Sequence, residues 1–509
     1  MVAPPASHPL FPTVSHTDVR SIVIGLMLAI LLGAMEQTIV SVSLPMMSAD
    51  LQGVDLLAWV VSAYLITVAV TTPIYGKLGD LYGRRFMLST AISIFLVGSV
   101  LCALATSMPM LVAARIVQGI GGGGLISLAQ TIIGDVVSPR ERGRYQGYIS
   151  GAFALASVSG PVLGGMLTQY LSWRWIFWIN LPLCAVTLIY TRHVLKRLPT
   201  RAQIKHPIDY IGAILLTIGL TALLVGVTRV GHGTAWIESA NLMLFTLALI
   251  SIALFIWQEQ RAIEPIIPLS LFRNTTVALS CAIMFIAFIQ IIALSVLIPL
   301  RLQMLTNLGA DGAALQLVPM SLGIPFGSFV AGRLASHTGR YKRLQQTGAG
   351  LVPLLILALA LTTPHATVLN LVWMGLAGFT LGLQLPTSLV AIQNAVEYRH
   401  IGVVTAVGAF CRSLGAAVGI AILMALLLAT LQSQAPESLS SLSGGQIINA
   451  MVGDTLIRIE TAVRLELAAT VESAFSYVFI ASAVIAALAF VLSLFIADEA
   501  LSDEAPSLA

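Results

Sequence analysis

The stretch Gly76–Leu88 reads GKLGDLYGRRFML and separates two long apolar runs. It holds one acid, Asp80, three bases, Lys77, Arg84 and Arg85, and three glycines, in a chain of which only 9% of the residues are charged. So polar a segment is costly to place in hydrocarbon, and its first and last glycines, seven residues apart, allow the backbone to reverse tightly. We therefore predict a charged loop between two membrane-spanning helices.

Composition places the chain among polytopic membrane proteins. Hydrophobic residues make up 57% of its 509 residues, more than the core of a soluble protein buries. The formal charge of +4 arises from bases scattered over short segments, so no nucleic-acid partner is predicted. The four cysteines stand inside apolar runs without paired or metal-ligand spacing, which predicts free thiols and no metal site. The stretch up to Arg20 lacks the basic region of a signal peptide, so the first apolar run should remain in the protein.

A window of about twenty residues, the length that spans a bilayer, predicts fourteen spanning helices and places both termini on one side. The apolar runs are 21–45, 56–75, 86–106, 109–134, 146–169, 175–194, 208–228, 239–258, 275–299, 312–333, 347–363, 366–390, 402–430 and 474–497. With the termini in the cytoplasm, nineteen of the 26 Lys and Arg fall inside, five fall outside, and Arg115 and Arg412 lie within helices. This asymmetry favours that orientation, in a cell inner or plasma membrane.

An internal repeat supports the helix count. The pattern of Gly76, Leu78, Gly83 and Arg84 recurs 256 residues later as Gly332, Leu334, Gly339 and Arg340, with Ser336 in the place of Asp80. Repeats of this kind indicate two equivalent halves. We predict an all-α protein with two six-helix halves and two extra central helices, divided into a tail (1–20), the first half (21–194), a linker with helices 7 and 8 (195–274), the second half (275–497) and a tail (498–509).

The motif between the second and third runs gives a family resemblance. Gly76, Leu78, Asp80, Gly83, Arg84 and Arg85 match G-x-L-x-D-x-x-G-R-[RK], and here the chain resembles the major facilitator superfamily of transporters. The resemblance implies a cytoplasmic loop whose acid takes part in a charge latch between the two halves. The alternative is that the bases only set the topology and Asp80 neutralises one of them.

Glu36 is the only acid well inside a predicted spanning helix, in the sequence GAMEQTIVSVSLP of residues 33–45. A carboxylate at membrane depth costs several kcal/mol, so it should face the bundle interior, where Gln37 and Ser41 widen the polar surface. The segment is similar to the helix 1 motif of the drug:proton antiporters with fourteen spanning helices, with Glu in place of Asp. That resemblance implies exchange of a proton for substrate at Glu36. The alternative is a structural acid bonded permanently to a neighbouring helix.

Arg115, Gln118, Gly119 and Gly122 share one stripe of the fourth predicted helix. The stretch resembles the R-x-x-Q-G motif of the superfamily, whose Arg is associated with proton transfer. We predict that Arg115 acts with Glu36 in coupling and that Gln37, Ser41 and Gln118 line a substrate cavity. A fixed ion pair that only tethers helices is the alternative.

Helix 5 contains ASVSGPVLGG at residues 156–165. Gly160 and Gly164 form a small-residue face for helix packing, and Pro161 permits a bend. With Gly165 these residues match G-P-x-x-G-G, which is associated with exporters in the superfamily. The resemblance therefore implies export, although glycines alone indicate only close packing.

Three further charged residues complete the predictions. Asp135 ends helix 4 beside a basic run and is predicted to join the latch with Arg85 or Arg142, or to be solvated. Asp80 is also predicted near Gly402, where a helix N-terminus favours a carboxylate. Arg412 resembles part of an R-x-x-G-x-x-x-G run of the antiporter branch, and its role stays open between packing and gating.

The sequence therefore predicts a secondary transporter and no enzyme. No Walker motif, cofactor motif or metal-ligand cluster is present to supply another energy source. We expect a proton-coupled exporter of amphipathic or hydrophobic drugs, with cationic drugs favoured, whose partners are the substrate, protons and the lipid bilayer. A dedicated exporter of one metabolite, lipid or siderophore and a non-transporting sensor or scaffold are the alternatives. The segment 431–473 is predicted outside the cytoplasm as a surface-lying helix or flap, and a periplasmic adaptor docking there is a further hypothesis.

Overall fold

The computed structural model describes residues 16–51, 56–137, 139–196, 209–231, 234, 236–306, 308, 310–397, 400–434 and 461–501, and within these ranges it contains helices and no strand. The helices are α1 (His16–Leu51), α2 (Leu57–Tyr82), α3 (Arg84–Ala103), α4 (Met108–Val136), α5 (Pro139–Tyr170), α6 (Trp175–Trp178), α7 (Asn180–Leu195), α8 (Tyr210–Gly231), α9 (Ser239–Glu259), η2 (Leu269–Arg273), α10 (Thr275–Leu305), α11 (Ala310–Leu315), α12 (Val318–Thr338), α13 (Lys342–Leu361), α14 (Thr367–Asn394), α15 (Ile401–Ser433) and α17 (Thr461–Leu494). The all-α prediction is confirmed for these residues.

Twelve of the described helical segments are long and apolar enough to cross a membrane. The predicted fifth and tenth spanning helices correspond to α5 and α12, which are helical but are not among these twelve. Both are more polar because α5 begins with the run PRERGRYQ and α12 carries several glycines, serines and an arginine. The count of fourteen spanning helices therefore stays a prediction.

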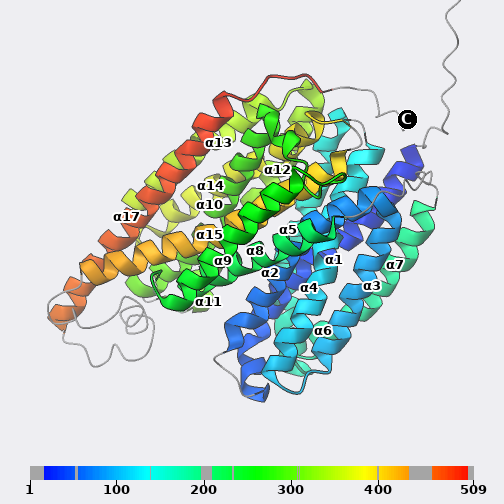
Figure 1. Cartoon of the computed structure of the whole chain (residues 1–509). Helices are drawn as coiled ribbons and strands as arrows, with labels where there is room; N and C mark the ends of the chain where they lie inside the picture. Colours follow the sequence, from blue (N-terminus) through cyan, green and yellow to red (C-terminus); the bar gives the residue numbers. More distant parts are fainter. Residues whose placement is uncertain are drawn as a thin grey trace, which may run out of the picture.

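The helices form two groups that lie side by side (Figure 1). Helices α1–α7 share two apolar clusters, one around Leu26, Phe95 and Leu128 and one around Phe177, whereas α10–α17 share a cluster that includes Leu297. Helices α8 and α9 pack on each other, and their apolar side chains join those of α2, α10 and α15 in a separate cluster. The pair thus contacts both groups, a position suited to an insertion between halves.

The charged segment at residues 76–88 differs from the predicted loop. Helix α2 continues to Tyr82, α3 starts at Arg84, and Gly83 alone separates them with φ of 90°. Gly76 lies inside α2, where a Cβ would collide with Ala406 of α15. Its role is therefore close packing between helices rather than chain reversal.

The internal repeat also has a glycine with positive φ in the second group. Gly339 ends α12 with φ of 69°, in the left-handed region, at the position equivalent to Gly83. Leu501 donates its backbone N–H to the Gly339 carbonyl at 2.9 Å, so the described C-terminal segment returns to this end of the molecule. We call it the Gly83 end, and we call the opposite end, at the turn after α3, the Leu104 end.

The two helix groups meet closely at the Gly83 end. Gly143 of α5 and Gly332 of α12 are in backbone contact there, and a Cβ on Gly147 would lie 3.1 Å from the Cα of Phe329. Toward the Leu104 end the helices of the two groups diverge (Figure 1). The molecule is therefore closed at the Gly83 end.

The predicted surface helix before the last spanning helix is only partly described. Residues 435–460 lie outside the described part of the chain, and from Thr461 the backbone continues without interruption into α17. Residues 461–472 are therefore the first turns of the long terminal helix rather than a separate surface element. The adaptor hypothesis falls on the undescribed stretch and stays a prediction.

Candidate functional site: a buried ion pair

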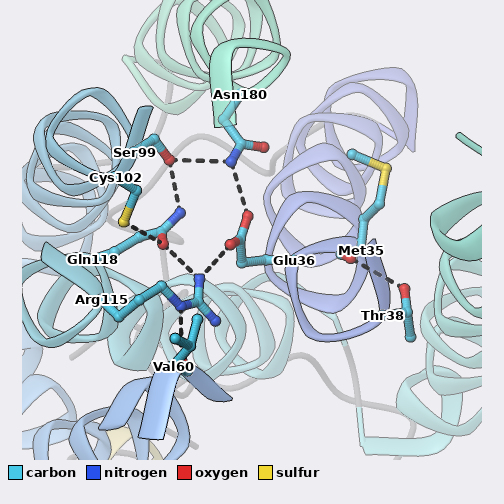
Figure 2. A network of polar contacts seen from close by, with 9 residues as sticks. All are labelled: Met35, Glu36, Thr38, Val60, Ser99, Cys102, Arg115, Gln118 and Asn180. Atoms are coloured by element: carbon cyan, nitrogen blue, oxygen red, sulfur yellow. Dashed lines mark hydrogen bonds and ion pairs between the residues drawn. The ribbon is translucent and has the colours of Figure 1, made fainter. Parts of the chain in front are cut away.

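Glu36 and Arg115 form an ion pair inside the first helix group (Figure 2). Glu36 lies in α1 and is 0% exposed, and Arg115 lies in α4 and is 1% exposed. Helices α1 and α4 come close here because Gly33, one turn before Glu36, has no side chain between it and Ile126. Among the described residues, the Arg115 guanidinium is the one opposite charge that pairs with this carboxylate.

Polar groups from three further helices complete this network. The Asn180 amide at the start of α7 donates to Glu36 Oε2 at 2.8 Å and to Ser99 Oγ of α3 at 3.0 Å. Arg115 donates to the side-chain amide oxygen Oε1 of Gln118 at 2.6 Å and to the Val60 backbone carbonyl of α2 at 3.0 Å. The Gln118 amide in turn donates to Ser99 at 2.7 Å, which closes a ring of hydrogen bonds visible in Figure 2.

An aromatic ring covers the remaining face of the guanidinium. The Tyr64 ring of α2 lies 4.2 Å from the Arg115 guanidinium carbon, and Tyr64 is itself buried. A buried ion pair is stable only when further hydrogen bonds satisfy both charges, and this one has them. Loss or gain of one proton on Glu36 would therefore change the partners of several helices at once.

The predicted substrate cavity residues do not share a surface. Gln118 is fully buried in the network, whereas Gln37 is exposed on another face of α1. Ser41 lies outside the residues whose side chains the structure describes. Ser43, two turns after Glu36 in α1, shares a hydrogen bond with Thr168 of α5 at 2.6 Å. The structure thus brings Glu36, Arg115 and Gln118 together and separates them from Gln37.

Asn180, Ser99 and Tyr64 are three residues of this site that were not predicted from the sequence. Asn180 was detectable as a lone amide inside the apolar run WIFWINLPL, since a buried amide requires partners. Ser99 and Tyr64 gave no such signal, because single Ser and Tyr residues are common in spanning helices.

A second charged cluster lies at the Gly83 end. Arg84 donates to Asp80 at 2.9 Å and forms an ion pair with Asp135 of α4. Asp80 Oδ2 also accepts the backbone N–H of Val403 at 3.2 Å, in the first turn of α15. The structure therefore places Asp80 between its own helix group and the N-terminus of a helix in the other group.

The other predicted latch residues behave differently. Asp135 pairs with Arg84, not with the predicted Arg85 or Arg142. Arg142 is buried and donates to the carbonyls of Gly134 at 2.6 Å and Val137 at 3.3 Å, which fixes the turn between α4 and α5. Arg85 is partly exposed at the start of α3.

A further ion pair in this region joins Lys77 of α2 to Glu264, after α9, at 2.6 Å. It connects the inserted helix pair to the first group. The sequence analysis did not predict it, because the two residues are 187 positions apart.

The glycine motif of α5 packs against α1. A Cβ on Gly160 would collide with Thr38, and one on Gly164 would lie 2.7 Å from the Ile39 carbonyl oxygen. Helix α5 is continuous through these positions. The side chain of Pro161 lies outside the described set, and Gly165 is partly buried. The motif therefore sets the α1–α5 distance one turn beyond Glu36.

The two groups of spanning helices, their closure at one end and a buried ion pair at membrane depth define a polytopic α-helical membrane transporter. The sequence of residues 26–420 matches the family model of the Major Facilitator Superfamily, and the chain belongs to this family. Its function is accordingly transport rather than catalysis, with small-molecule substrates bound within the membrane.

Individual relatives are similar over most of the chain. It is 32% identical to multidrug resistance protein 3 of Bacillus subtilis (strain 168) over 495 residues, covering 95% of this chain and 96% of that protein. It is 32% identical to the multidrug transporter protein MdtP of the same organism over 412 residues, covering 80% and 75%. Among solved structures, the proton:xylose symporter XylE shares the fold at TM-score 0.60 with 15% identity, covering 95% of this chain and 98% of the other.

Proposed function

We propose that the protein is a proton-coupled exporter of amphipathic compounds that works by alternating access. The observation that carries the proposal is the buried Glu36–Arg115 ion pair, which joins α1 to α4 and bonds directly to α2 and α7. Similarity to two multidrug proteins and the glycine motif of α5 support export. The proposal includes a cell membrane location with both termini, and hence the Gly83 end, in the cytoplasm.

Protonation of Glu36 is the proposed coupling step. The neutral acid would no longer compensate Arg115, and the guanidinium would keep only the Gln118 and Val60 oxygens as acceptors. Because an unpaired buried charge is unstable, the helices that supply these groups would rearrange. The Asp80–Val403 contact between the two groups would then break at the Gly83 end, exposing the space between the halves to the other side.

A buried acid such as Glu36 suits a cationic substrate when one of its oxygens is free to bind it. In this structure both oxygens of Glu36 are occupied, by Arg115 and Asn180. That reason for a cationic substrate therefore does not apply to the conformation described. The alternative, a dedicated exporter of one compound, differs only in the number of substrates. Measuring transport of a panel of different compounds would distinguish the two.

Proton exchange by purified protein in liposomes with an acidic lumen tests the proposal. Three probes share a pyrenylbutyl body and carry a permanent cation (trimethylammonium), a permanent anion (sulfonate) or a neutral hydroxyl, so passive proton carriage by the probe is avoided. We expect at least one charged probe to drive proton release from the lumen, and Glu36→Gln to abolish that release while still binding the probe.

The matched control is Glu238→Gln, which removes an exposed carboxylate paired with Arg229 at 3.0 Å. It should release protons like the unaltered protein. Equal release by Glu36→Gln would exclude Glu36 from coupling, and probe transport without proton release would exclude proton coupling altogether.

A further inference from the structure

Arg412 lies on α15 where the two helix groups face each other, and no role has been assigned to it. Its guanidinium carbon is 5.3 Å from the Phe288 ring of α10 and 6.0 Å from the Phe153 ring of α5. One ring thus comes from each group of helices. The side chain is half-buried, and within the described part of the chain no carboxylate pairs with it.

Two glycines fix this position. Gly415 and Gly419 lie one and two turns after Arg412, and a Cβ on either would collide with α10, at Phe285 and Ile289 respectively. Helix α15 therefore lies flush against α10, and Arg412 is held next to Phe288. The R-x-x-G-x-x-x-G run thus places a guanidinium at a defined point.

The depth of Arg412 makes its charge costly. It lies nine residues after Val403, the residue that contacts Asp80 at the Gly83 end, so it is roughly 14 Å along the helix from that end. A hydrocarbon layer is about 30 Å thick, which places Arg412 near its middle. Charges at this depth normally pair with an opposite charge or face a binding path.

Within the described residues, no acid on the helices around α15 pairs with it. Helices α8, α10 and α14 pack on α15 and contain no Asp or Glu. Asp80 of α2 and Asp135 of α4 pair with Arg84 at the Gly83 end, and Glu36 of α1 pairs with Arg115. An uncompensated guanidinium between two aromatic rings has the donors for a carboxylate, sulfonate or phosphate group. The rings supply an apolar surface for the rest of such a molecule.

We infer that Arg412, Phe153 and Phe288 form an anion-binding subsite between the two helix groups, and that the substrate is an amphipathic organic anion. The anionic head pairs with Arg412, and the apolar body lies against the rings. This inference rests on the proposed exporter function. The substrate inferred from Arg412 is therefore an anion, whereas the acid Glu36 alone favours a cation.

Binding without any proton gradient tests the subsite. The three pyrenylbutyl probes, sulfonate, trimethylammonium and hydroxyl, are titrated against purified protein in detergent, and the shift in its thermal unfolding midpoint gives an apparent affinity for each. Partition into detergent is the same for every variant and cancels in the comparison. We expect the sulfonate to bind at least tenfold more tightly than the alcohol, with the trimethylammonium probe weakest.

Arg412→Gln should reduce the preference for sulfonate over alcohol to within twofold, because the alcohol never used the charge. Arg412→Lys keeps a cation but loses the planar guanidinium, and it should retain part of the preference. Arg229→Gln, which alters an arginine paired with Glu238, is the control and should bind all three probes unchanged.

Three results would overturn the subsite. They are equal affinity of the unaltered protein for sulfonate and alcohol, stronger binding of the trimethylammonium probe, and a sulfonate preference that survives Arg412→Gln. If that variant does not fold, an unchanged preference in Arg412→Lys would be equally decisive. A sulfonate preference without proton release would contradict only the proton-coupled function, whereas proton release driven solely by the cation would contradict only the subsite.

Discussion

At the scale of single residues, the main feature is that two deep arginines have different surroundings. Arg115 is enclosed by a carboxylate, an amide, a backbone carbonyl and the Tyr64 ring. Arg412 has aromatic rings around it and no acid among the described residues. A charge at membrane depth costs free energy unless it is compensated. Arg115, which has a carboxylate partner, is therefore suited to an internal switch, and Arg412, which has none, is suited to binding a ligand.

The Glu36–Arg115 pair gives a prediction for stability. Glu36→Gln and Arg115→Gln each leave a buried charge without its partner, which costs on the order of 3–5 kcal/mol. The double variant leaves two amides that can bond each other, so it should be more stable than the sum of the two single losses predicts. Thermal unfolding of the four proteins in the same detergent measures this coupling.

Additive losses in that cycle would show that the two side chains do not interact energetically. The same double change at Arg229 and Glu238 is the comparison, because that pair is partly exposed and exposed pairs contribute about 0–1 kcal/mol. Its coupling should therefore be small.

At the scale of helices, glycines decide which helices approach one another. The contact between α5 and α12 depends on Gly143 and Gly332, which meet backbone to backbone at the Gly83 end. Asp80 adds an electrostatic contact to the first turn of α15, where a carboxylate is favoured by about 0.3–1 kcal/mol. The Gly83 end is thus held closed mainly by the close backbone contact of two helices, and the Asp80 carboxylate adds an electrostatic contribution.

Gly332→Ala should shift the molecule away from this closed form. The added methyl group collides with the Gly143 carbonyl, and overpacking of this kind costs about 1–3 kcal/mol. A cost of about 1.4 kcal/mol changes a population ratio tenfold. The measurement is the rate of maleimide labelling of an Ala406→Cys thiol, buried in the closed form, in a background without the native cysteines.

The matched control is Gly151→Ala. Gly151 is on the same helix, α5, and a Cβ there meets nothing within 4 Å, so labelling should keep its original rate. An unchanged rate in Gly332→Ala as well would mean that the α5–α12 contact does not control closure.

At the scale of the whole molecule, the two groups contact closely at one end and diverge at the other (Figure 1). The inserted helix α8 packs against α2 and α15, and α9 packs on α8. Lys77–Glu264 ties the segment after α9 to α2. Alternating access would require the Gly83 end to open while these contacts to both groups are kept or exchanged. That the two halves and the inserted pair move as separate units, with the boundaries given above, therefore stays a proposal.

A reversible crosslink at the Gly83 end tests that motion. In Gly147→Cys/Phe329→Cys, the new Cβ at position 147 would lie 3.7 Å from the Cβ at 329, within the usual range for a disulfide. Oxidation should abolish most probe transport, and dithiothreitol should restore it. The two single-cysteine variants are the controls and should not respond to oxidant.

Full transport by the oxidised, crosslinked protein would contradict opening at this end. Loss of transport that reductant does not reverse would point to damage by the substitutions, and the single variants would identify which one causes it.

The class of protein and most of its helices could be predicted from sequence because hydropathy and the cost of buried charge are local properties. Each apolar run coincides with a helix, but the boundaries agree unevenly: 402–430 lies within a few residues of α15, whereas α17 begins at Thr461, well before the predicted 474–497. The depth of Glu36 and Arg115 singled them out before any contact was known. The segment around Gly83 was harder, since helix α2 is stabilised up to Tyr82 by packing of Gly76 on another helix, which no local pattern records.

What the sequence determined by itself is a polytopic α-helical chain with a repeated glycine turn and a few costly charges at membrane depth. Only the tertiary structure decided which groups those charges meet. Glu36 bonds Asn180 across 144 residues and Asp80 bonds Val403 across 323, whereas Arg412 meets aromatic rings from both groups. The physical reason is that the free energy of placing a residue in hydrocarbon depends on that residue and its own apolar segment. Ion pairs and hydrogen bonds between helices depend instead on how segments far apart in the sequence pack together.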